Sequence, residues 1–342
     1  MRILVIRTSA MGDVALLIPV IRGLREKYPV EEISILTRQE FHIFFEPISG
    51  IELISPDFSG RHMGATGLLR LSGDLVKKVR PDLVVDLHDV IRTRVLRLLF
   101  RLKGIRVFVI NKGRREKKAV TRGKVKKMLK HTIERYCETF SRAGYSIEPY
   151  PGKNITISGT AGKKAEEILS QGGLINIGIA PFAKHSLKEW PAPNMKKLLH
   201  LIYKRTPCNF WFFGGPDEST RLEDLSSGIP NCKILAGRMS LEEELAVMGQ
   251  MEFMIAMDSS NMHMAALLGI KVVSLWGATD PVTGFGPWMQ PESHLIRIPS
   301  EELSCRPCTV YGKGKCRRGD FACMNWLTPE IVYDRIINMN II

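Results

Sequence analysis

The residues best suited to chemistry lie in one short segment near the last third of the chain. A short apolar run, 253–257, is followed at once by Asp258-Ser259-Ser260-Asn261, and all four are residue types that cap the first turn of a helix. A helix that begins at the carboxyl end of a parallel strand directs unpaired N–H groups and a partial positive charge toward the edge where such sheets bind ligands. The pattern therefore predicts a phosphate-binding turn, with His263 facing it from the first turns of the helix. An ordinary helix cap beside a packing histidine is the alternative.

A second candidate is the carboxylate of Asp13. It ends the small-residue loop that follows a first predicted strand, 2–7, and it precedes a helix-forming segment, 14–27. Asp13 is equally suited to capping this helix and to serving as a general base at the carboxyl end of the strand. The loop is neither a GxGxxG nor a GxxxxGK[ST] sequence, which argues against a nicotinamide-dependent oxidoreductase and a P-loop NTPase.

Two lysines offer positive charge in the second half of the chain. Lys184 and Lys188 lie in the polar loop that follows the predicted strand 175–180, where each could place an ammonium group beside a phosphate. Solvated surface lysines would look the same. The pair Gly214-Gly215 allows the backbone to approach a nucleotide closely, although it also suits a simple turn.

Short apolar runs alternate with helix-forming segments along the whole chain, which predicts parallel sheets covered by helices on both faces. The 342 residues exceed the usual size of one hydrophobic core, so we expect two domains. The Pro-Gly-rich stretch 149–152 marks a linker. We therefore expect domains at 1–160 and 161–327, with a last helix in 328–342 that packs back across them. The expected strands are 2–7, 32–37, 51–55, 83–87, 106–110, 175–180, 209–213, 253–257 and 271–276.

The net charge of +14 is concentrated in one stretch. Between residues 92 and 130 there are 16 Lys or Arg and one acid, Glu116, so the rest of the chain sums to about −1. Such a stretch favours an anionic partner: a membrane surface, a phosphorylated lipid or a nucleic acid. Its most basic part, 111–130, lacks apolar periodicity before Val125, which predicts a mobile loop.

The seven cysteines and the absence of a signal-peptide pattern or long apolar run indicate a reducing cytosol. Four of them, near the C-terminus, are spaced so that they could surround a zinc ion. Packing thiols are the favoured alternative, and we expect neither a metal nor a cofactor in the reaction. These four are Cys305, Cys308, Cys316 and Cys323.

At this point four motifs resemble those of the family 9 glycosyltransferases, the ADP-heptose:lipopolysaccharide heptosyltransferases. They occur in order and span nearly the whole chain, and the Cys-Arg-Pro-Cys run near the C-terminus is similar to that of the family's second-heptose branch. The motifs are RILVIRTSAMGDV at 2–14, KHSLKEWP at 184–191, LAGRMSLEE at 235–243 and AMDSSNMHMAALLGIKVVSLWGATDP at 256–281.

The resemblance implies an α/β GT-B fold, in which two Rossmann-like doubly wound domains face each other across a cleft. It implies that the N-terminal domain binds the acceptor and that the C-terminal domain binds the sugar nucleotide. Asp13 matches the family's catalytic carboxylate, and Arg7 would help to stabilise charge on the leaving diphosphate. Donor contacts are implied for Lys188, Met239, Asp258, Ser259, Ser260 and His263. We add Lys184 to them for its charge, although the family has a small hydroxyl residue at that position. The family usually has Thr-Gly where this chain has Ser259-Ser260.

The implied function is inverting, metal-independent transfer of a heptose from a nucleoside-diphosphate sugar, ADP-heptose, to the inner core of lipopolysaccharide. We assign acceptor binding to Arg61, Arg114, Arg115 and Arg122. The basic stretch would hold a cytoplasmic enzyme at the inner membrane face near an anionic glycolipid. One alternative is a related transferase with another nucleotide sugar or acceptor. A nucleic-acid-binding protein is disfavoured, because the basic stretch has few aromatic residues on which bases could stack.

Overall fold

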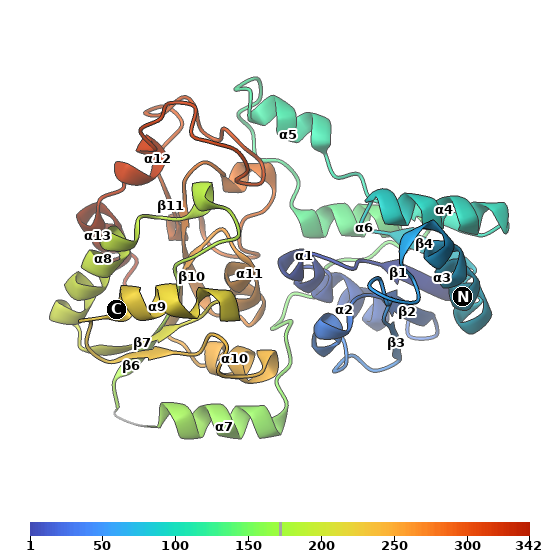
Figure 1. The fold of residues 1–342 in the computed structure, drawn as a ribbon, viewed down its shortest axis with the longest axis horizontal. Helices are drawn as coiled ribbons and strands as arrows, with labels where there is room; N and C mark the ends of the chain where they lie inside the picture. The colour runs from blue at the N-terminus through green and yellow to red at the C-terminus, as the bar shows by residue number, and fades with distance from the viewer. Residues whose placement is uncertain (171–172) are drawn as a thin grey trace. The chain divides into compact units, whose positions relative to one another are not determined.

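The computed structural model describes residues 1–170 and 173–342 of the chain. The chain packs as two compact units, each of which is described by itself. The first unit contains 1–112 and 130–156, and the second contains 113–129 and 157–342. Both units alternate strands and helices, as Figure 1 shows.

The first unit is built on a parallel sheet of five strands in the order β3-β2-β1-β4-β5. This is the order of a Rossmann-type sheet, and its central strands are buried because helices cover both faces. The strands are β1 (Arg2–Ile6), β2 (Glu32–Leu36), β3 (Ile51–Ile54), β4 (Leu83–Asp86) and β5 (Arg106–Val109).

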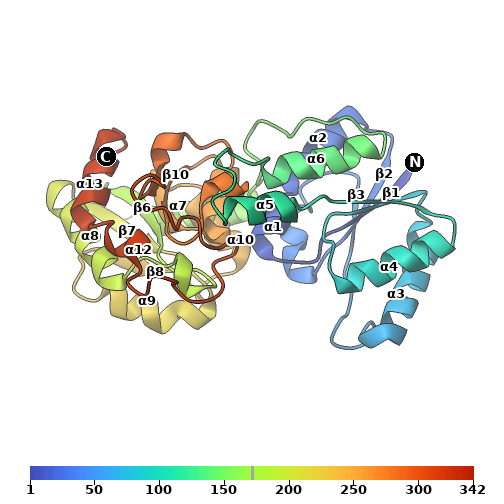
Figure 2. The same ribbon diagram turned by 90° about the horizontal axis from the view of Figure 1, so that it is seen from above.

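Helices of the first unit form a layer on each side of this sheet. Figure 2 shows α3 and α4 on one side and α2 and α6 on the other. Apolar side chains of α3 and α4, such as Leu71 and Phe100, share a core with Leu4 and Val84 of the sheet. The helices are α1 (Met11–Ala15), α2 (Ile18–Lys27), the 3-10 helix η1 (Gln39–Phe44), α3 (Gly64–Val79), α4 (Ile91–Leu102) and α6 (Thr132–Arg142).

The second unit is built on a parallel sheet of six strands in the order β11-β10-β9-β6-β7-β8. Counted from its first strand, this is again the Rossmann order 3-2-1-4-5-6. The prediction of two Rossmann-like α/β domains is confirmed. The strands are β6 (Ile175–Ala180), β7 (Cys208–Phe212), β8 (Cys232–Ile234), β9 (Phe253–Met257), β10 (Lys271–Trp276) and β11 (Leu295–Arg297).

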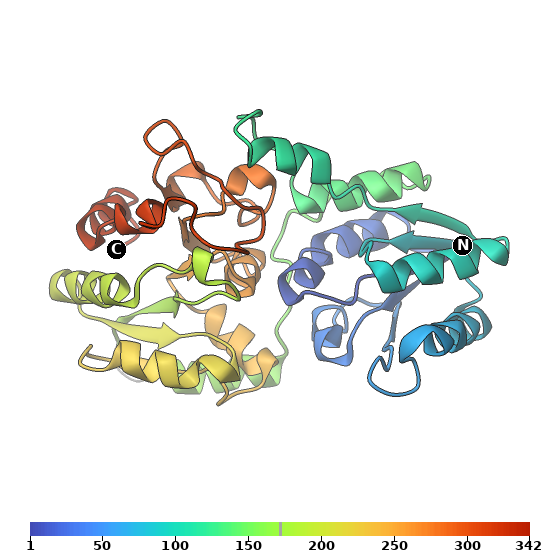
Figure 3. The same ribbon diagram turned by 45° about the horizontal axis from the view of Figure 1, so that its top comes forward.

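Helices of the second unit follow these strands in turn. The last of them, α13, packs beside α8, as Figure 3 shows, and places Val332 and Ile336 in the core of this unit. The α-helices are α5 (Arg114–Val120), α7 (Gly159–Leu169), α8 (Ala192–Arg205), α9 (Ser219–Ser226), α10 (Leu241–Met248), α11 (Ser260–Leu267), α12 (Ala322–Asn325) and α13 (Pro329–Asn338). The 3-10 helices are η2 (Ser186–Lys188), η3 (Pro216–Glu218), η4 (Pro281–Thr283) and η5 (Glu292–His294). None of the helices in the described ranges could reach across a bilayer as an apolar segment.

The most basic part of the chain, 111–130, is only partly the loop predicted from its lack of periodicity, because turns and irregular structure in 121–130 follow a helix. Residues 114–120 form α5, and the segment packs on the second unit although it lies in sequence between strands and helices of the first. Lys117 is buried with its ammonium 3.7 Å from the ring centre of Phe285, and the Leu129 N–H donates to the Val282 carbonyl. A periodicity analysis counts a lysine as polar even when its alkyl stem is buried. For this reason α5 was not predicted from the sequence.

A buried arginine closes the end of the sheet in the second unit. The guanidinium of Arg306 donates to the carbonyls of Gly277 (2.7 Å), Trp276 (3.2 Å) and Ile298, and it lies 3.3 Å from a carboxylate oxygen of Asp280. Its side chain is 1% exposed, and burial holds the pKa of Arg306 below its ordinary value. These bonds join the ends of β10 and β11 to the C-terminal loop.

We predict that Arg306→Leu will lower the free energy of unfolding by about 3 kcal/mol or more, because it leaves several buried carbonyls without their donor, whereas Asp280 keeps Arg297 as a partner. The matched control is Arg318→Leu, which removes an exposed arginine paired with Asp320 in the same loop. Thermal and denaturant unfolding should show a clear loss for the first variant and a nearly unchanged midpoint for the second. Equal midpoints would contradict this role for Arg306.

Candidate active site

Asp13 and Arg7 form an ion pair at the carboxyl end of β1. Arg7 Nη2 lies 2.5 Å from Asp13 Oδ2, and Arg7 Nη1 donates to the Leu87 carbonyl at 2.6 Å. Arg7 is buried, whereas the Asp13 side chain, in the first turn of α1, is 31% exposed. The structure thus brings together the two residues predicted for catalysis in this half of the chain. Because part of the Asp13 carboxylate reaches solvent, Asp13 could accept a proton from a bound substrate.

The pair is positioned by neighbouring parallel strands that end at one edge. Strands β1 and β4 are paired from Ile3 with Leu83 to Ile6 with Asp86, so the loops that follow them meet. Burial is the largest single effect on Arg7 and opposes its charge, but Asp13, Tyr136 and Asp86 together outweigh burial, and the pKa of Arg7 lies above its ordinary value. Tyr136 of α6 donates its hydroxyl hydrogen to the Asp13 carbonyl at 3.0 Å and fixes the start of α1 from the other side.

His88 joins the two loops and was not assigned a role from the sequence. Its Nδ1 lies 3.1 Å from Thr8 Oγ1 and its Nε2 lies 3.2 Å from Ser9 Oγ. Burial, reinforced by the nearby charges of Arg7 and Lys112, lowers the pKa of His88 to about 3. The imidazole is therefore neutral near pH 7 and holds the loop that leads to Asp13.

A fully buried carboxylate supports the same corner. Asp86 Oδ1 accepts hydrogen bonds from the backbone N–H groups of His88 (2.9 Å) and Asp89 (3.0 Å), and its Oδ2 accepts one from Arg97 of α4 (2.9 Å). The charge of Asp86 is thus satisfied by an arginine and two amides, as a buried carboxylate requires. The role of His88 could not be predicted from the sequence, because its partners Thr8 and Ser9 lie about 80 residues away.

In the second unit, Lys188 and Asp258 form the corresponding pair. Lys188 Nζ lies 2.8 Å from Asp258 Oδ2, and the two side chains are 17% and 8% exposed. Strands β6 and β9 are adjacent, so the loop with Lys188 and the turn with Asp258 meet at one edge of the sheet. Two residues that the sequence assigned to donor binding are therefore in contact.

The serines beside this pair begin α11. Ser259 is the N-cap residue, but its side chain makes no capping bond; its Oγ is buried and has no hydrogen-bond partner among the residues that the structure describes. The simple cap interpretation is wrong for this hydroxyl. Ser260 is half-buried in the first turn, and His263 is buried one turn later. The N–H groups of this turn and the Ser259 hydroxyl are suited to an anionic oxygen.

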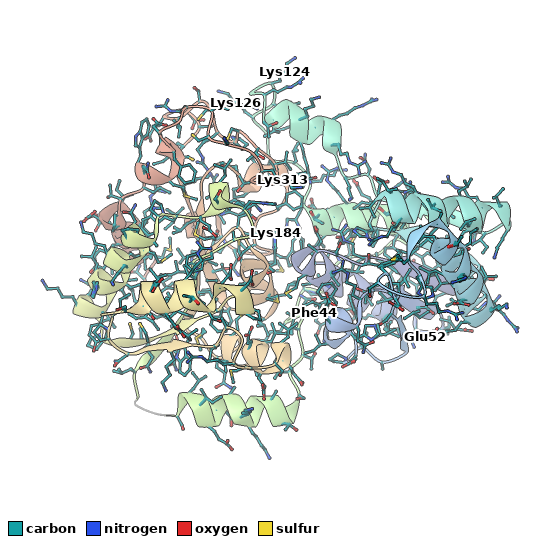
Figure 4. The ribbon with its side chains drawn as sticks, in the orientation of Figure 1. Phe44, Glu52, Lys124, Lys126, Lys184 and Lys313 are labelled. Atoms are coloured by element: carbon teal, nitrogen blue, oxygen red, sulfur yellow. The ribbon has the colours of Figure 1, made fainter. Side chains whose placement is uncertain are left out.

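Further positive charge surrounds the same loop. Lys184 is exposed, and His185 has a pKa that burial lowers, with further lowering by Lys188, Lys313 and Lys184. Figure 4 labels Lys184 and Lys313 on neighbouring loops of the second unit. Gly312 next to Lys313 has φ of +76°, and a Cβ there would lie 2.6 Å from Lys188 Cγ. No role was predicted for Lys313 from the sequence. Its only signal is the glycine that precedes it in a cysteine-rich loop.

Met239 lies in the turn between β8 and α10. It is half-buried and directly precedes Ser240, which caps α10 in a reciprocal arrangement with Glu243, as the sequence predicts. Strand β8 is two places from β6 in the sheet, so Met239 stands apart from the Lys188–Asp258 pair in the strand order.

The arginines expected to bind the acceptor divide between the units. Arg61 belongs to the first unit, is exposed, and makes a bidentate pair with Asp74 at 2.8 and 3.1 Å. Arg114 and Arg115 are exposed on α5, and Arg122 is exposed in the turn after it, all in the second unit.

The four C-terminal cysteines line one cavity of about 20 Å³, together with Arg306 and Phe321. Among the described residues, no group of three or more His, Cys, Asp or Glu side chains is arranged to hold a metal ion. Burial, with neighbouring thiols adding to it, raises the pKa of Cys308, and burial raises the pKa of Cys323 to about 12. These two thiols are protonated at neutral pH.

Several known proteins resemble the chain over most of its length. Lipopolysaccharide heptosyltransferase 1 of Salmonella typhimurium is 24% identical over 318 residues, which cover 87% of this chain and 97% of the relative. The solved structure of a family 9 glycosyl transferase from Veillonella parvula has a TM-score of 0.76 at 21% identity and covers 99% of this chain and 96% of its own. E. coli heptosyltransferase WaaC with ADP has a TM-score of 0.68 at 19% identity and covers 99% of this chain and 100% of its own.

The two structural likenesses show that the fold is shared. The assignment to a family rests on a further match, to the family model described as glycosyltransferase family 9 (heptosyltransferase), which spans residues 75–315. That span exceeds half of the chain and includes the Lys188–Asp258 pair. The resemblance noted in the sequence is confirmed: the chain belongs to glycosyltransferase family 9, and it is a transferase.

Proposed function

We propose that this protein is an inverting, metal-independent heptosyltransferase that moves a heptose from ADP-heptose to the inner core of lipopolysaccharide. The proposal rests on two clusters of charged residues, one at the carboxyl end of each parallel sheet. The first contains Asp13 and Arg7, and the second contains Lys188 and Asp258. Relatives named as lipopolysaccharide heptosyltransferases, and solved relatives with ADP and with ADP-2-deoxy-2-fluoro heptose, support the choice of donor and acceptor.

Asp13 has the properties of a general base for a sugar hydroxyl. Its carboxylate is partly exposed while its partner Arg7 is buried, so an acceptor hydroxyl can approach it from solvent. A neighbouring positive charge favours the ionised form of a carboxylate. Asp13 would take the proton as the acceptor oxygen attacks the anomeric carbon from the face opposite the diphosphate.

The corner around Lys188 has the properties of a diphosphate site. An ammonium, the N–H groups that begin α11 and the Ser259 hydroxyl, which has no partner in the part of the chain that the structure describes, all offer hydrogens to anionic oxygens. In the leaving-group step these groups would stabilise the negative charge that develops as the bond to the sugar breaks. Lys184 and Lys313 add positive charge at the same loop, which supports a mechanism in which side chains, not a metal ion, neutralise the diphosphate.

The basic residues of 92–130 support an anionic glycolipid acceptor at the inner membrane face. Arg114, Arg115 and Arg122 are the residues we propose for acceptor phosphates, because all three are exposed on one basic segment. Each Lys or Arg held near an anionic membrane adds about 1 kcal/mol to its attraction.

We predict that Asp13→Asn will lower turnover by about 10²- to 10⁴-fold, because the amide cannot accept the acceptor's proton. Donor affinity, measured by titration calorimetry with ADP-heptose, should be unchanged. The matched control is Asp82→Asn, which alters another arginine-paired carboxylate of the first unit, bound to Arg2 at 2.9 Å. Turnover near that of the wild type in Asp13→Asn would remove Asp13 as the base.

We predict that Lys188→Met will weaken binding of ADP by about 10- to 100-fold, because a partly buried charge that faces the diphosphate is lost. The change also removes the ion-pair partner of the buried Asp258. The double variant Lys188→Met/Asp258→Asn is therefore included to separate an effect on binding from an effect on folding. Lys197→Met, which removes an exposed lysine paired with Glu330, serves as the control. Equal ADP affinity in all of these proteins would contradict the assignment of Lys188.

We predict a pH-dependent contribution of His88 to stability. Its folded-state pKa, about 3, lies below the ordinary value of 6.5, so the unfolded chain takes up the proton first. Stability should therefore fall as the pH decreases from 6.5 toward 3, and His88→Gln should reduce this loss. Denaturant midpoints measured across this range would test it, with His200→Gln on the exposed side of α8 as the control. Identical pH profiles for His88→Gln and the wild type would refute the prediction.

A further inference from the structure

Helix α4 exposes a stripe of large apolar side chains to solvent. Ile91 is 81% exposed, Leu98 is 59% exposed and Leu102 is 76% exposed. At 3.6 residues per turn these three positions fall within an arc of about 40° on the helix. Side chains of the opposite face, such as Leu96 and Phe100, fill the core beneath. The stripe is therefore additional to the apolar surface that the fold itself requires.

Basic residues flank the stripe on both sides. Arg94 and Arg101 lie on one side of it, and Arg92 and Lys103 lie on the other, all exposed. The helix contains no acidic residue. Its fourth arginine, Arg97, is engaged internally with Asp86 and Asp89 and attaches the helix to the sheet.

Neighbouring elements do not cancel this charge. In the described part of the chain, the ion pairs of α4 are made with Asp86 and Asp89 after β4. Beside it, α3 exposes Arg70 and Lys77, together with Lys78, which is paired with Glu52, and contains one acid, Asp74, which is paired with Arg61. Figure 2 shows α3 and α4 side by side on the same face of the sheet.

We infer that α4 is the element that inserts into an anionic lipid surface. An apolar stripe bordered by arginine and lysine is the pattern of a helix that lies in the plane of a membrane interface, with its apolar side chains in the acyl boundary and its cations among the phosphates. The inference deepens the proposed function, on which it rests for its connection to a lipid-linked acceptor. Helix α4 begins at Ile91, three residues after His88, which contacts the loop that leads to Asp13. A membrane along this helix therefore lies beside the edge of the sheet that carries Asp13.

The test uses the full chain and two kinds of vesicle, one of phosphatidylethanolamine with phosphatidylglycerol and one of phosphatidylcholine alone. Co-sedimentation should show binding to the anionic vesicles. Leu98→Gln/Leu102→Gln should lower the partition coefficient about tenfold or more, because the apolar contacts are lost. Arg101→Gln/Lys103→Gln should lower it by about fivefold for each charge removed. Val30→Gln, which changes an exposed apolar side chain elsewhere in the first unit, should bind as the wild type does.

Insertion is distinguished from surface attraction by a tryptophan reporter. Leu98→Trp should be quenched by brominated acyl chains, and Val30→Trp should not. Unchanged vesicle binding of Leu98→Gln/Leu102→Gln, or no quenching of Leu98→Trp, would overturn the inference. So would a solution dimer that this double variant dissociates, since a second copy of the chain would then cover the stripe.

The same variants separate this inference from the proposed function. Transfer to a water-soluble, delipidated acceptor should proceed equally in the wild type and in Leu98→Gln/Leu102→Gln. If the wild type transfers no heptose yet binds anionic vesicles through α4, the proposed function fails and the inference stands. If transfer is normal and vesicle binding ignores α4, the inference fails and the proposed function stands.

Discussion

The structure depends on pairing the charges that its two parallel sheets bury at their carboxyl edges. Taking an isolated charge out of water costs several kcal/mol, so each such group needs a partner or a set of hydrogen bonds. Arg7 has Asp13 and the Leu87 carbonyl, Asp86 has Arg97 and two amides, and Lys188 has Asp258. A parallel Rossmann-type sheet makes this arrangement accessible, since strands that are adjacent in space end at the same edge and bring distant loops together.

Pairing also decides which groups remain available for chemistry. Arg7 and Asp86 are enclosed by their partners, whereas Asp13 keeps part of its carboxylate in solvent and Ser259 keeps an unbonded hydroxyl in the described structure. The enclosed members fix the geometry, and the groups that are partly exposed or keep an unbonded hydroxyl can meet a substrate. His88 belongs to the first class: with a pKa lowered to about 3, it is a neutral hydrogen-bonding group that organises the β1 loop and is unsuited to proton transfer near neutral pH.

Local sequence patterns were sufficient to predict the elements and part of the site. Apolar runs located the strands except β8 and β11, which have three residues each, and Ser240 with Glu243 predicted the cap of α10. Asp258 was found because it follows a strand directly, and Asp13 because it ends the short loop after the first strand. The partners of these residues were harder to find. Nothing near His88 in the sequence points to Ser9, and nothing near Arg306 points to Trp276, because these contacts depend on which strands become neighbours. Lys313 escaped notice for the same reason, since it reaches the Lys188 loop from a distant part of the chain.

The basic stretch 92–130 shows most clearly why composition alone cannot assign a role. Its charge is continuous in sequence, yet α4 packs in the first unit and α5 in the second. On α5 a lysine, Lys117, is buried against Phe285, while on α4 the leucines Leu98 and Leu102 are left in solvent. Each helix thus reverses the usual preference of one residue type, and in each case the neighbours supply the reason. An aromatic face and an alkyl stem compensate the buried lysine, whereas the exposed leucines of α4 are flanked by exposed cations. A surface of that composition is explained most simply by an apolar and anionic environment outside the protein.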